Sequence, residues 1–172
     1  MADLDYLKPT KVDLPKKTFT GSCMCKKMTY TVDLALPEQP VAQRCNCTYC
    51  TKSGQDVYKV PGEDFHLKTP CSTAEAIADD NTHGKRMGRF TIQASSPNLH
   101  RYFCDQCGNL VFTAGWFEYE GHRIDYFGFN SKTLDQPQEG LDLSKFKFDY
   151  FDGLNGNYFA KKTDGPHPGG TI

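Results

Sequence analysis

The chain of 172 residues has the length of a single domain and is long enough to bury a hydrophobic core. Its 20 basic and 21 acidic residues leave a formal net charge of −1, so no global positive charge favours nucleic acid or an anionic membrane. Twelve Phe, nine Tyr and fifteen Gly favour short strands and turns over long helices. We therefore expect a mainly β protein that has neither nucleic acid nor membrane as a partner.

The two ends of the chain differ in composition from its middle. Residues 1–17 are charged and contain two prolines, which predicts a loosely held N-terminal arm. Residues 161–172 are rich in proline and glycine and predict a flexible tail. A single domain is therefore expected at residues 18–160. No apolar run has the length of a signal peptide or a transmembrane helix, so we expect a cytoplasmic location.

The first half of the domain has mainly the pattern of strands. Residues 16–34 alternate well enough to predict two strands that meet near the first cysteines. Residues 36–43 are expected to form a proline-bounded loop, and residues 56–69 are typical of a strand, a Pro-Gly turn and a second strand. The alanine-rich centre of residues 69–86 favours a short helix with Glu75 in its first turn.

The second half of the domain also favours strands. Residues 110–129 are rich in aromatic side chains, and Gly115 and Gly121 are expected to break them into successive strands. Further strands are predicted at residues 88–95, 99–104 and 145–151.

Seven of the eight cysteines fall into three groups. In a reducing compartment such clusters indicate metal binding rather than disulfides. A C-x-x-C pair followed by glycine lets both sulfurs converge at a turn, and C-x-C places both sulfurs on one face of an extended chain. The groups are Cys23 and Cys25; Cys45, Cys47 and Cys50; and Cys104 and Cys107.

The first and last groups together supply four thiolates, a full tetrahedral set for a structural zinc ion that joins distant parts of the chain. The middle group, Cys45, Cys47 and Cys50, then lacks a fourth ligand. If Cys71 supplies it, the second zinc site is closed and structural. If not, the site keeps a position for water or substrate, as catalytic zinc requires. The spacing alone leaves both possibilities open.

The three groups, in this order, resemble the glutathione-dependent formaldehyde-activating enzyme family, also called the GFA or CENP-V domain. The resemblance spans roughly residues 18 to 150. The matching segments are GSCMCKKMTY at 21–30, CNCTYCTKSG at 45–54, RYFCDQCGNLVF at 101–112 and KTLDQP at 132–137.

This resemblance implies an Mss4-like fold of several antiparallel β-sheets around zinc. It implies a structural zinc on Cys23, Cys25, Cys104 and Cys107. It also implies a second zinc at the active site on Cys45, Cys47 and Cys50, with an exchangeable fourth position. The family's named activity joins glutathione to formaldehyde to give S-hydroxymethylglutathione, and its members are classed as carbon–sulfur lyases. A zinc ion with three thiolate ligands is a weak Lewis acid, so holding a substrate thiolate is its more natural role.

The sequence departs from the family pattern at two positions. Lys26 follows the C-x-C pair, where the family usually has glycine, and Asn46 stands in a motif that is often Cys-His-Cys. Neither change removes a sulfur ligand. The loss of an imidazole beside the second zinc removes a proton shuttle or a substrate contact, so Asn46 is a candidate substrate residue.

A glutathione-like ligand carries carboxylates, which makes cations near the cysteines of interest. Lys52 and Arg101 are the candidates, with Arg89 as a third. Among the histidines, which could act as acids, bases or a fourth ligand, His100 lies four residues before Cys104 and is the first to test. The others are His66, His83, His122 and, in the tail, His167.

The sequence therefore predicts a zinc-dependent carbon–sulfur lyase that acts on glutathione or on a thiol adduct of a small aldehyde or metabolite. Two alternatives stay open. One is a non-catalytic, zinc-stabilised binding module, in which Cys71 or a histidine closes the second site. The other is a pathway enzyme on the same scaffold that acts without glutathione.

Overall fold

The computed structural model describes residues 13–78, 87–91 and 97–169. Several predicted features lie outside these ranges: residues 1–12 of the arm, residues 79–86 with His83, residues 92–96 and residues 170–172. The described residues form two β-sheets and two six-residue α-helices, α1 (Thr48–Ser53) and α2 (Thr73–Ala78). The mainly β fold predicted from the sequence is confirmed.

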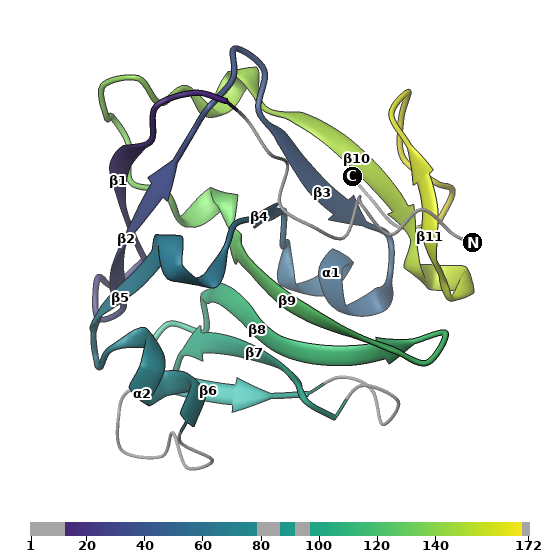
Figure 1. Ribbon diagram of the computed structural model, residues 1–172, viewed down its shortest axis with the longest axis horizontal. Coiled ribbons are helices and arrows are strands. Elements are labelled where there is room, and N and C mark those ends of the chain that lie inside the picture. The colour runs from purple at the N-terminus through teal and green to yellow at the C-terminus, as the bar shows by residue number, and fades with distance from the viewer. Residues whose placement is uncertain (1–12, 79–86, 92–96, 170–172) are drawn as a thin grey trace.

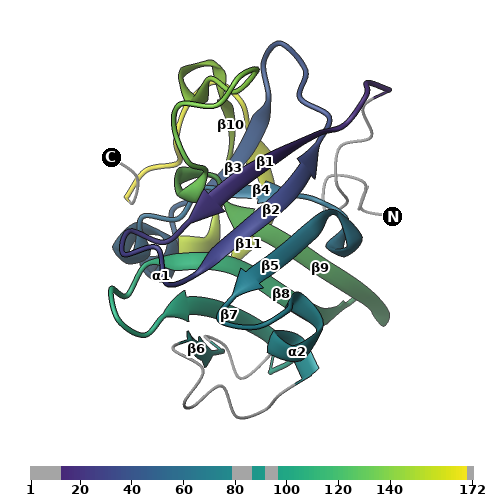
Figure 2. The same ribbon diagram turned by 90° about the vertical axis from the view of Figure 1, so that its left-hand side faces the viewer.

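The smaller sheet has three antiparallel strands in the order β1-β2-β5 (Figure 2). Its strands are β1 (Lys17–Ser22), β2 (Thr29–Leu34) and β5 (Phe65–Thr69). In Figure 2 these strands lie in front of β8 and β9 of the larger sheet. The two strands expected within residues 16–34 are β1 and β2, and the turn between them carries the first cysteine pair.

The larger sheet has eight strands in the order β11-β10-β3-β4-β9-β8-β7-β6 (Figure 1). All its neighbouring strands are antiparallel except β3 and β10, which are parallel, so the sheet is mixed rather than purely antiparallel. Its strands are β3 (Val41–Cys45), β4 (Val57–Lys59), β6 (Met87–Phe90), β7 (Leu99–Cys104), β8 (Leu110–Tyr119), β9 (His122–Asn130), β10 (Lys147–Asp152) and β11 (Asn157–Lys162).

Within the described ranges, four short 3₁₀ turns connect these elements: η2 (Gly62–Asp64), η3 (Ser131–Thr133), η4 (Leu143–Lys145) and η5 (Gly153–Asn155). The helix expected within residues 69–86 is α2. Its N-terminus has a capping box, because the backbone N–H of Ser72 donates to the Glu75 carboxylate and the N–H of Glu75 donates to the Ser72 hydroxyl.

Stacked aromatic rings form the core between the sheets. Tyr30 of β2 stacks on Phe65 of β5 with ring centroids 4.6 Å apart, and Phe65 contacts Phe112 of β8 at 5.2 Å. Phe112 in turn stacks on Tyr102 of β7 at 4.3 Å. All four side chains are buried, so one face of the larger sheet, called here the core face, packs against the smaller sheet.

Two expectations about local structure are wrong. Gly115 does not break a strand, because β8 runs through it to Tyr119. Its φ of +137° and the close approach of the Asn98 carbonyl leave no room for a side chain, so glycine here marks a close backbone contact. The loop predicted at residues 36–43 is wrong from Val41 onward, where β3 begins. This strand is held by pairing with β4 and β10, and β10 lies about 100 residues further along the chain.

Candidate metal centres

The first cluster brings together four cysteines from two sheets. Cys23 and Cys25 lie in the β1–β2 turn, whereas Cys104 ends β7 and Cys107 lies in the β7–β8 turn. Their four sulfur atoms all lie within 4.8 Å of one another. The Cys23 and Cys25 sulfurs are 3.6 Å apart, and those of Cys25 and Cys104 are 3.5 Å apart.

These distances fit a tetrahedral zinc ion. Zn–S bonds of about 2.3 Å at tetrahedral angles place neighbouring sulfurs about 3.8 Å apart. None of the four thiols is in a disulfide. The backbone N–H of Met28 donates to the Cys23 sulfur at 3.2 Å, as expected for a sulfur that carries negative charge. A metal here would join the two sheets.

The second cluster contains the other three predicted ligands. Cys45 ends β3, Cys47 is the N-cap of α1, and Cys50 lies within α1; their sulfurs also lie within 4.8 Å of one another. Backbone N–H groups donate to two of the sulfurs, from Cys47 to Cys45 and from Cys50 to Cys47, each at 3.4 Å. Figure 1 shows α1 between β3 and β9, where the larger sheet curves.

Without metal, the three thiols titrate as one group. Hydrogen bonds from the Cys45 and Cys50 thiols lower the pKa of Cys47 to about 2, and the corresponding bonds raise the pKa of Cys50. These hydrogen bonds favour the thiolate form of Cys47, which is the form that binds a soft metal ion.

Among the described residues, no fourth cysteine, histidine or carboxylate joins this three-cysteine site. Cys71 is in neither cluster; its side chain packs against the hydrophobic core. Three of the described histidines also lie outside this site: His66 lies near Asp33, His122 begins β9, and His167 lies in the tail near Asp152. His83 lies outside the described residues.

A buried carboxylate anchors the loop that follows α1. Asp56 is 2% exposed and accepts hydrogen bonds from the Arg44 guanidinium at 2.7 and 2.6 Å. Lys132 lies 3.2 Å from the same carboxylate and donates to the carbonyl of Gly54 at the end of α1. This ion-pair network ties β3, α1 and the β9–η3 segment together and so fixes the position of Cys50.

Asn46 lies between two of the ligands, but its side chain is engaged within the protein. The residue is 2% exposed, and its amide nitrogen donates to the Asp152 carboxylate at 2.9 Å and to the Pro168 carbonyl at 3.2 Å. Its amide oxygen accepts from the Leu154 N–H at 2.9 Å. The residue thus connects the metal motif with η5 and the tail, and its predicted substrate contact stays a prediction.

The two candidate cations differ in their surroundings. Arg101 of β7 lies over the Tyr49 ring of α1, with its guanidinium carbon 5.7 Å from the ring centroid. One of its NH₂ groups donates to the Leu99 carbonyl, and its Nε is buried without a hydrogen-bond partner. Lys52 is exposed in the last turn of α1. The structure therefore brings Arg101 beside the three-cysteine site although the sequence places it next to the other cluster.

His100 and Arg89 lie on the opposite side of the larger sheet. His100 is two residues from Tyr102 on β7 and meets its ring edge-on at 6.5 Å, which puts it on the core face. Arg89 is the register partner of Tyr102, so its side chain is on that face as well. Substrate roles for these residues stay predictions, but the sheet separates both from Arg101.

Two residues near the site were missed in the sequence. Lys59 of β4 places its ammonium group 5.2 Å from the centroid of the Tyr126 ring of β9. Burial lowers the pKa of Lys59 to about 7, against the opposing effect of the Asp149 carboxylate, and burial raises the pKa of Tyr126. A Val-Tyr-Lys strand carries no distinctive motif, so only the strand register reveals this pair.

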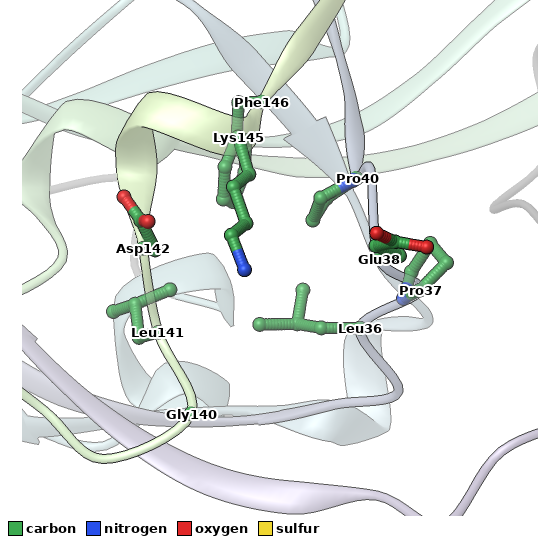
Figure 3. A pocket seen from close by; sticks show the side chains of 9 residues that line it. All are labelled: Leu36, Pro37, Glu38, Pro40, Gly140, Leu141, Asp142, Lys145 and Phe146. Atoms are coloured by element: carbon green, nitrogen blue, oxygen red, sulfur yellow. The ribbon is translucent and has the colours of Figure 1, made fainter.

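A separate open depression of about 410 Å³ lies between the β2–β3 connection and the segment before β10 (Figure 3). Leu36, Leu141 and Phe146 supply apolar walls, and the Lys145 side chain points into it. None of the predicted site residues lines this depression.

No helix in the described part of the chain is both long and apolar enough to cross a membrane. No curated protein matches the chain in sequence. A scan against protein families, however, matches residues 18–141 to the family described as glutathione-dependent formaldehyde-activating enzyme. The match covers both cysteine clusters and most of the two sheets, and the chain therefore belongs to the glutathione-dependent formaldehyde-activating enzyme (GFA) family.

Proposed function

We propose that this chain is a zinc-dependent enzyme of the carbon–sulfur lyase type. It makes or breaks the bond between the sulfur of a glutathione-like thiol and the carbon of a small aldehyde or related metabolite. The observation that supports this best is the three-cysteine site, which has no fourth ligand among the described histidines, cysteines and carboxylates. A tetrahedral ion on three protein sulfurs keeps one position for substrate. Membership of the GFA family supports the same reaction class.

The site residues have distinct roles in this proposal. Cys45, Cys47 and Cys50 hold the zinc ion at the end of β3, while the Asp56 network fixes α1 and with it Cys50. Bound zinc supplies the positive charge that keeps a substrate thiol ionised at neutral pH. The other cluster, with four sulfurs, is then a structural zinc site that joins the sheets.

Synthesis forms one C–S bond and breaks the carbonyl π bond, and the proton that the thiol loses balances the one that the oxygen gains. In the direction of synthesis the thiolate sulfur attacks the aldehyde carbon, the carbonyl electron pair moves to oxygen, and that oxygen takes a proton; cleavage is the reverse. Negative charge develops on the oxygen, so a cation or a neutral donor beside it lowers the barrier. Arg101 supplies a cation, and Tyr126 stays a protonated donor because burial raises its pKa.

Exchange kinetics at equilibrium test this proposal. Zinc-loaded protein is added to glutathione, ¹³C-formaldehyde and their adduct, and magnetisation transfer measures the exchange rate above the uncatalysed rate. We expect catalysed exchange in the wild type, a loss of at least about 100-fold in Cys47→Ser, and no loss in the matched control Cys71→Ser. X-ray absorption should count about 3.5 sulfurs per zinc, rising to about 4 with glutathione.

Two results would refute the proposal. An exchange rate equal to the uncatalysed one, with no change in sulfur count on adding glutathione, would rule out this activity. A sulfur count that falls in Cys71→Ser would mean that Cys71 closes the second site, and the protein would then be a zinc-stabilised binding module.

A further inference from the structure

The open depression between the β2–β3 connection and the segment before β10 shares no residue with either cysteine cluster (Figure 3). We propose that this depression binds a zwitterionic α-amino acid with an apolar side chain. Lys145 binds the carboxylate of the ligand, and Glu38 binds its ammonium group. The inference concerns a second ligand site and does not depend on the proposed function.

Two segments that are distant in the sequence form the walls of the depression, and hydrogen bonds fix them. The backbone N–H of Lys147 donates to the Pro40 carbonyl at 2.8 Å, at the point where β3 and β10 begin their parallel pairing. The N–H of Leu141 donates to the Gln138 carbonyl at 3.1 Å. The walls are therefore in place before a ligand binds, so binding has little backbone to order.

The floor of the depression is apolar and continuous with the core. Leu141 and Phe146 are each 7% exposed and belong to the hydrophobic core, and Leu36 packs against it. The Phe146 ring contacts the Tyr58 ring of β4 with centroids 5.6 Å apart, which holds it in position. An apolar side chain seated here covers the exposed edges of these residues, and the removal of apolar surface from water favours binding.

A cation and an anion face the depression from opposite walls. Figure 3 shows the Lys145 side chain reaching into the depression from the segment before β10, whereas Glu38 belongs to the β2–β3 connection. In the part of the chain that the structure describes, neither side chain forms an ion pair or a hydrogen bond. One positive and one negative group are thus available to a ligand that carries both charges.

The acidic residues argue against a ligand that is only an anion. Asp142 also lines the depression, and its carboxylate accepts from the N–H and the hydroxyl of Ser144 at 3.0 and 2.6 Å. Its charge and that of Glu38 together outweigh the single charge of Lys145. A carboxylate alone would be repelled by this excess, and an ammonium group on the same ligand offsets the repulsion.

The size of the depression suits one amino acid. Its volume of about 410 Å³ lies toward the lower end of the range of about 300–1,000 Å³ that is typical of small-molecule sites. Such sites combine apolar walls with a few polar groups that fix the orientation of the ligand. Here the floor would hold the side chain, while Lys145 and Glu38 would orient the two charged groups.

Titrations of the ¹⁵N-labelled, zinc-loaded protein, followed by amide chemical shifts, test this inference. The full probe is L-phenylalanine. Three related probes each lack one feature: L-phenylalaninamide lacks the carboxylate, 3-phenylpropionate lacks the ammonium group, and glycine lacks the apolar side chain. The variants are Lys145→Met and Glu38→Gln, both at exposed positions. Exposed Lys147, which does not line the depression, supplies the control Lys147→Met. Unchanged amide shifts elsewhere establish that each variant is folded.

We expect L-phenylalanine to shift the amides of Gly140 and Leu141 with a Kd on the order of 1 mM, because the depression is open to solvent. An exposed ion pair contributes little, so L-phenylalaninamide and 3-phenylpropionate should each bind about threefold more weakly. Glycine should not bind measurably, because the apolar side chain supplies most of the affinity.

The variants should separate the two charges. Lys145→Met should weaken the binding of L-phenylalanine about threefold and leave that of L-phenylalaninamide unchanged. Glu38→Gln should also weaken the binding of L-phenylalanine about threefold and leave that of 3-phenylpropionate unchanged. Lys147→Met should have no effect on any probe.

Other outcomes overturn the inference. Equal affinities for the three aromatic probes would mean that the depression takes apolar rings whatever their charge. Glycine that binds as tightly as L-phenylalanine would mean that the apolar floor makes no contribution. Shifts at Cys45–Cys50 instead of Gly140 and Leu141 would mean that the amino acid binds the metal site, and the absence of any saturable shift would mean that the depression binds no amino acid.

Discussion

Replacing Asn46 with alanine tests whether this amide holds the chain around the three-cysteine site or contacts substrate. The amide is 2% exposed and makes three hydrogen bonds, to Asp152, to the Pro168 carbonyl and from the Leu154 N–H. A neutral hydrogen bond contributes about 1 kcal/mol to stability and one to a charged group somewhat more. In Asn46→Ala the three partner groups can form hydrogen bonds with water instead, so each lost bond should contribute only its net value. We therefore expect the free energy of unfolding to fall by about 3 kcal/mol.

Thermal and urea unfolding measure this loss. For a chain of this size about 1 kcal/mol corresponds to a change of about 2–4 °C in Tm, so Tm should fall by about 6–12 °C. The tail should also lose an anchor, because the Pro168 carbonyl accepts from Asn46. Trypsin should then cleave faster after Lys161 and Lys162, at the end of β11.

Asn155→Ala is the matched control for Asn46→Ala. Asn155 also donates to the Asp152 carboxylate, at 3.1 and 2.8 Å, but it is exposed. Its loss should cost less than about 1 kcal/mol. If Asn46→Ala leaves Tm unchanged and weakens glutathione binding, the structural reasoning is wrong and the substrate contact predicted from the sequence is right.

Three further substitutions test other parts of the structure. Asp56→Ala should lower the free energy of unfolding, measured in urea, by about 3–5 kcal/mol, because it leaves the partly buried Arg44 cation without its partner. A loss below about 1 kcal/mol would mean that the ion pair does not hold this segment. Gly115→Ala should lower the free energy of unfolding by at least about 3 kcal/mol, because the φ of Gly115 is +137° and a backbone carbonyl fills the side-chain position. Gly121→Ala, which has open space around it, should lower it by only about 1 kcal/mol. Lys59→Met should raise the free energy of unfolding at pH 6, because burial disfavours the charged ammonium group in the folded chain. Burial lowers the pKa of Lys59 to about 7, so between about pH 7 and 10.5 the unfolded chain binds a proton at this residue that the folded chain does not. The stabilisation by Lys59→Met should therefore decrease across this range and vanish above it. A stabilisation that does not depend on pH would mean that the buried charge is not its cause.

The metal clusters could be predicted from the sequence because ligand spacing is a local property. C-x-C and C-x-x-C bring two sulfurs together whatever the rest of the chain does, and only the pairing of distant groups needs the fold. The structure pairs Cys23 and Cys25 with Cys104 and Cys107, as predicted. The strands were predictable for a similar reason, since alternation along a strand requires no knowledge of its partner.

What could not be predicted depends on contacts across the sheet. No spacing rule places Lys59 in one row with Arg101, because the row follows from the registers of three strand pairs. The hydrogen bonds of Asn46 also depend on segments more than 100 residues away along the chain. Helix α1 was missed because six residues around a cysteine motif give too short a window for helical periodicity.

The two clusters connect different parts of the fold. The four-cysteine cluster brings the β1–β2 turn to the β7–β8 turn, so a metal bound there would add a second link between the sheets to the aromatic core. The three-cysteine site lies within one stretch, Cys45 to Cys50, and joins no distant segments through its sulfurs. Its position is fixed instead by Asp56 and Asn46, whose partners come from β3, η5 and the segment after β9. Under the proposed function, an ion held in this way would exchange its fourth ligand while the sheets keep their packing, and a reaction at sulfur requires that freedom.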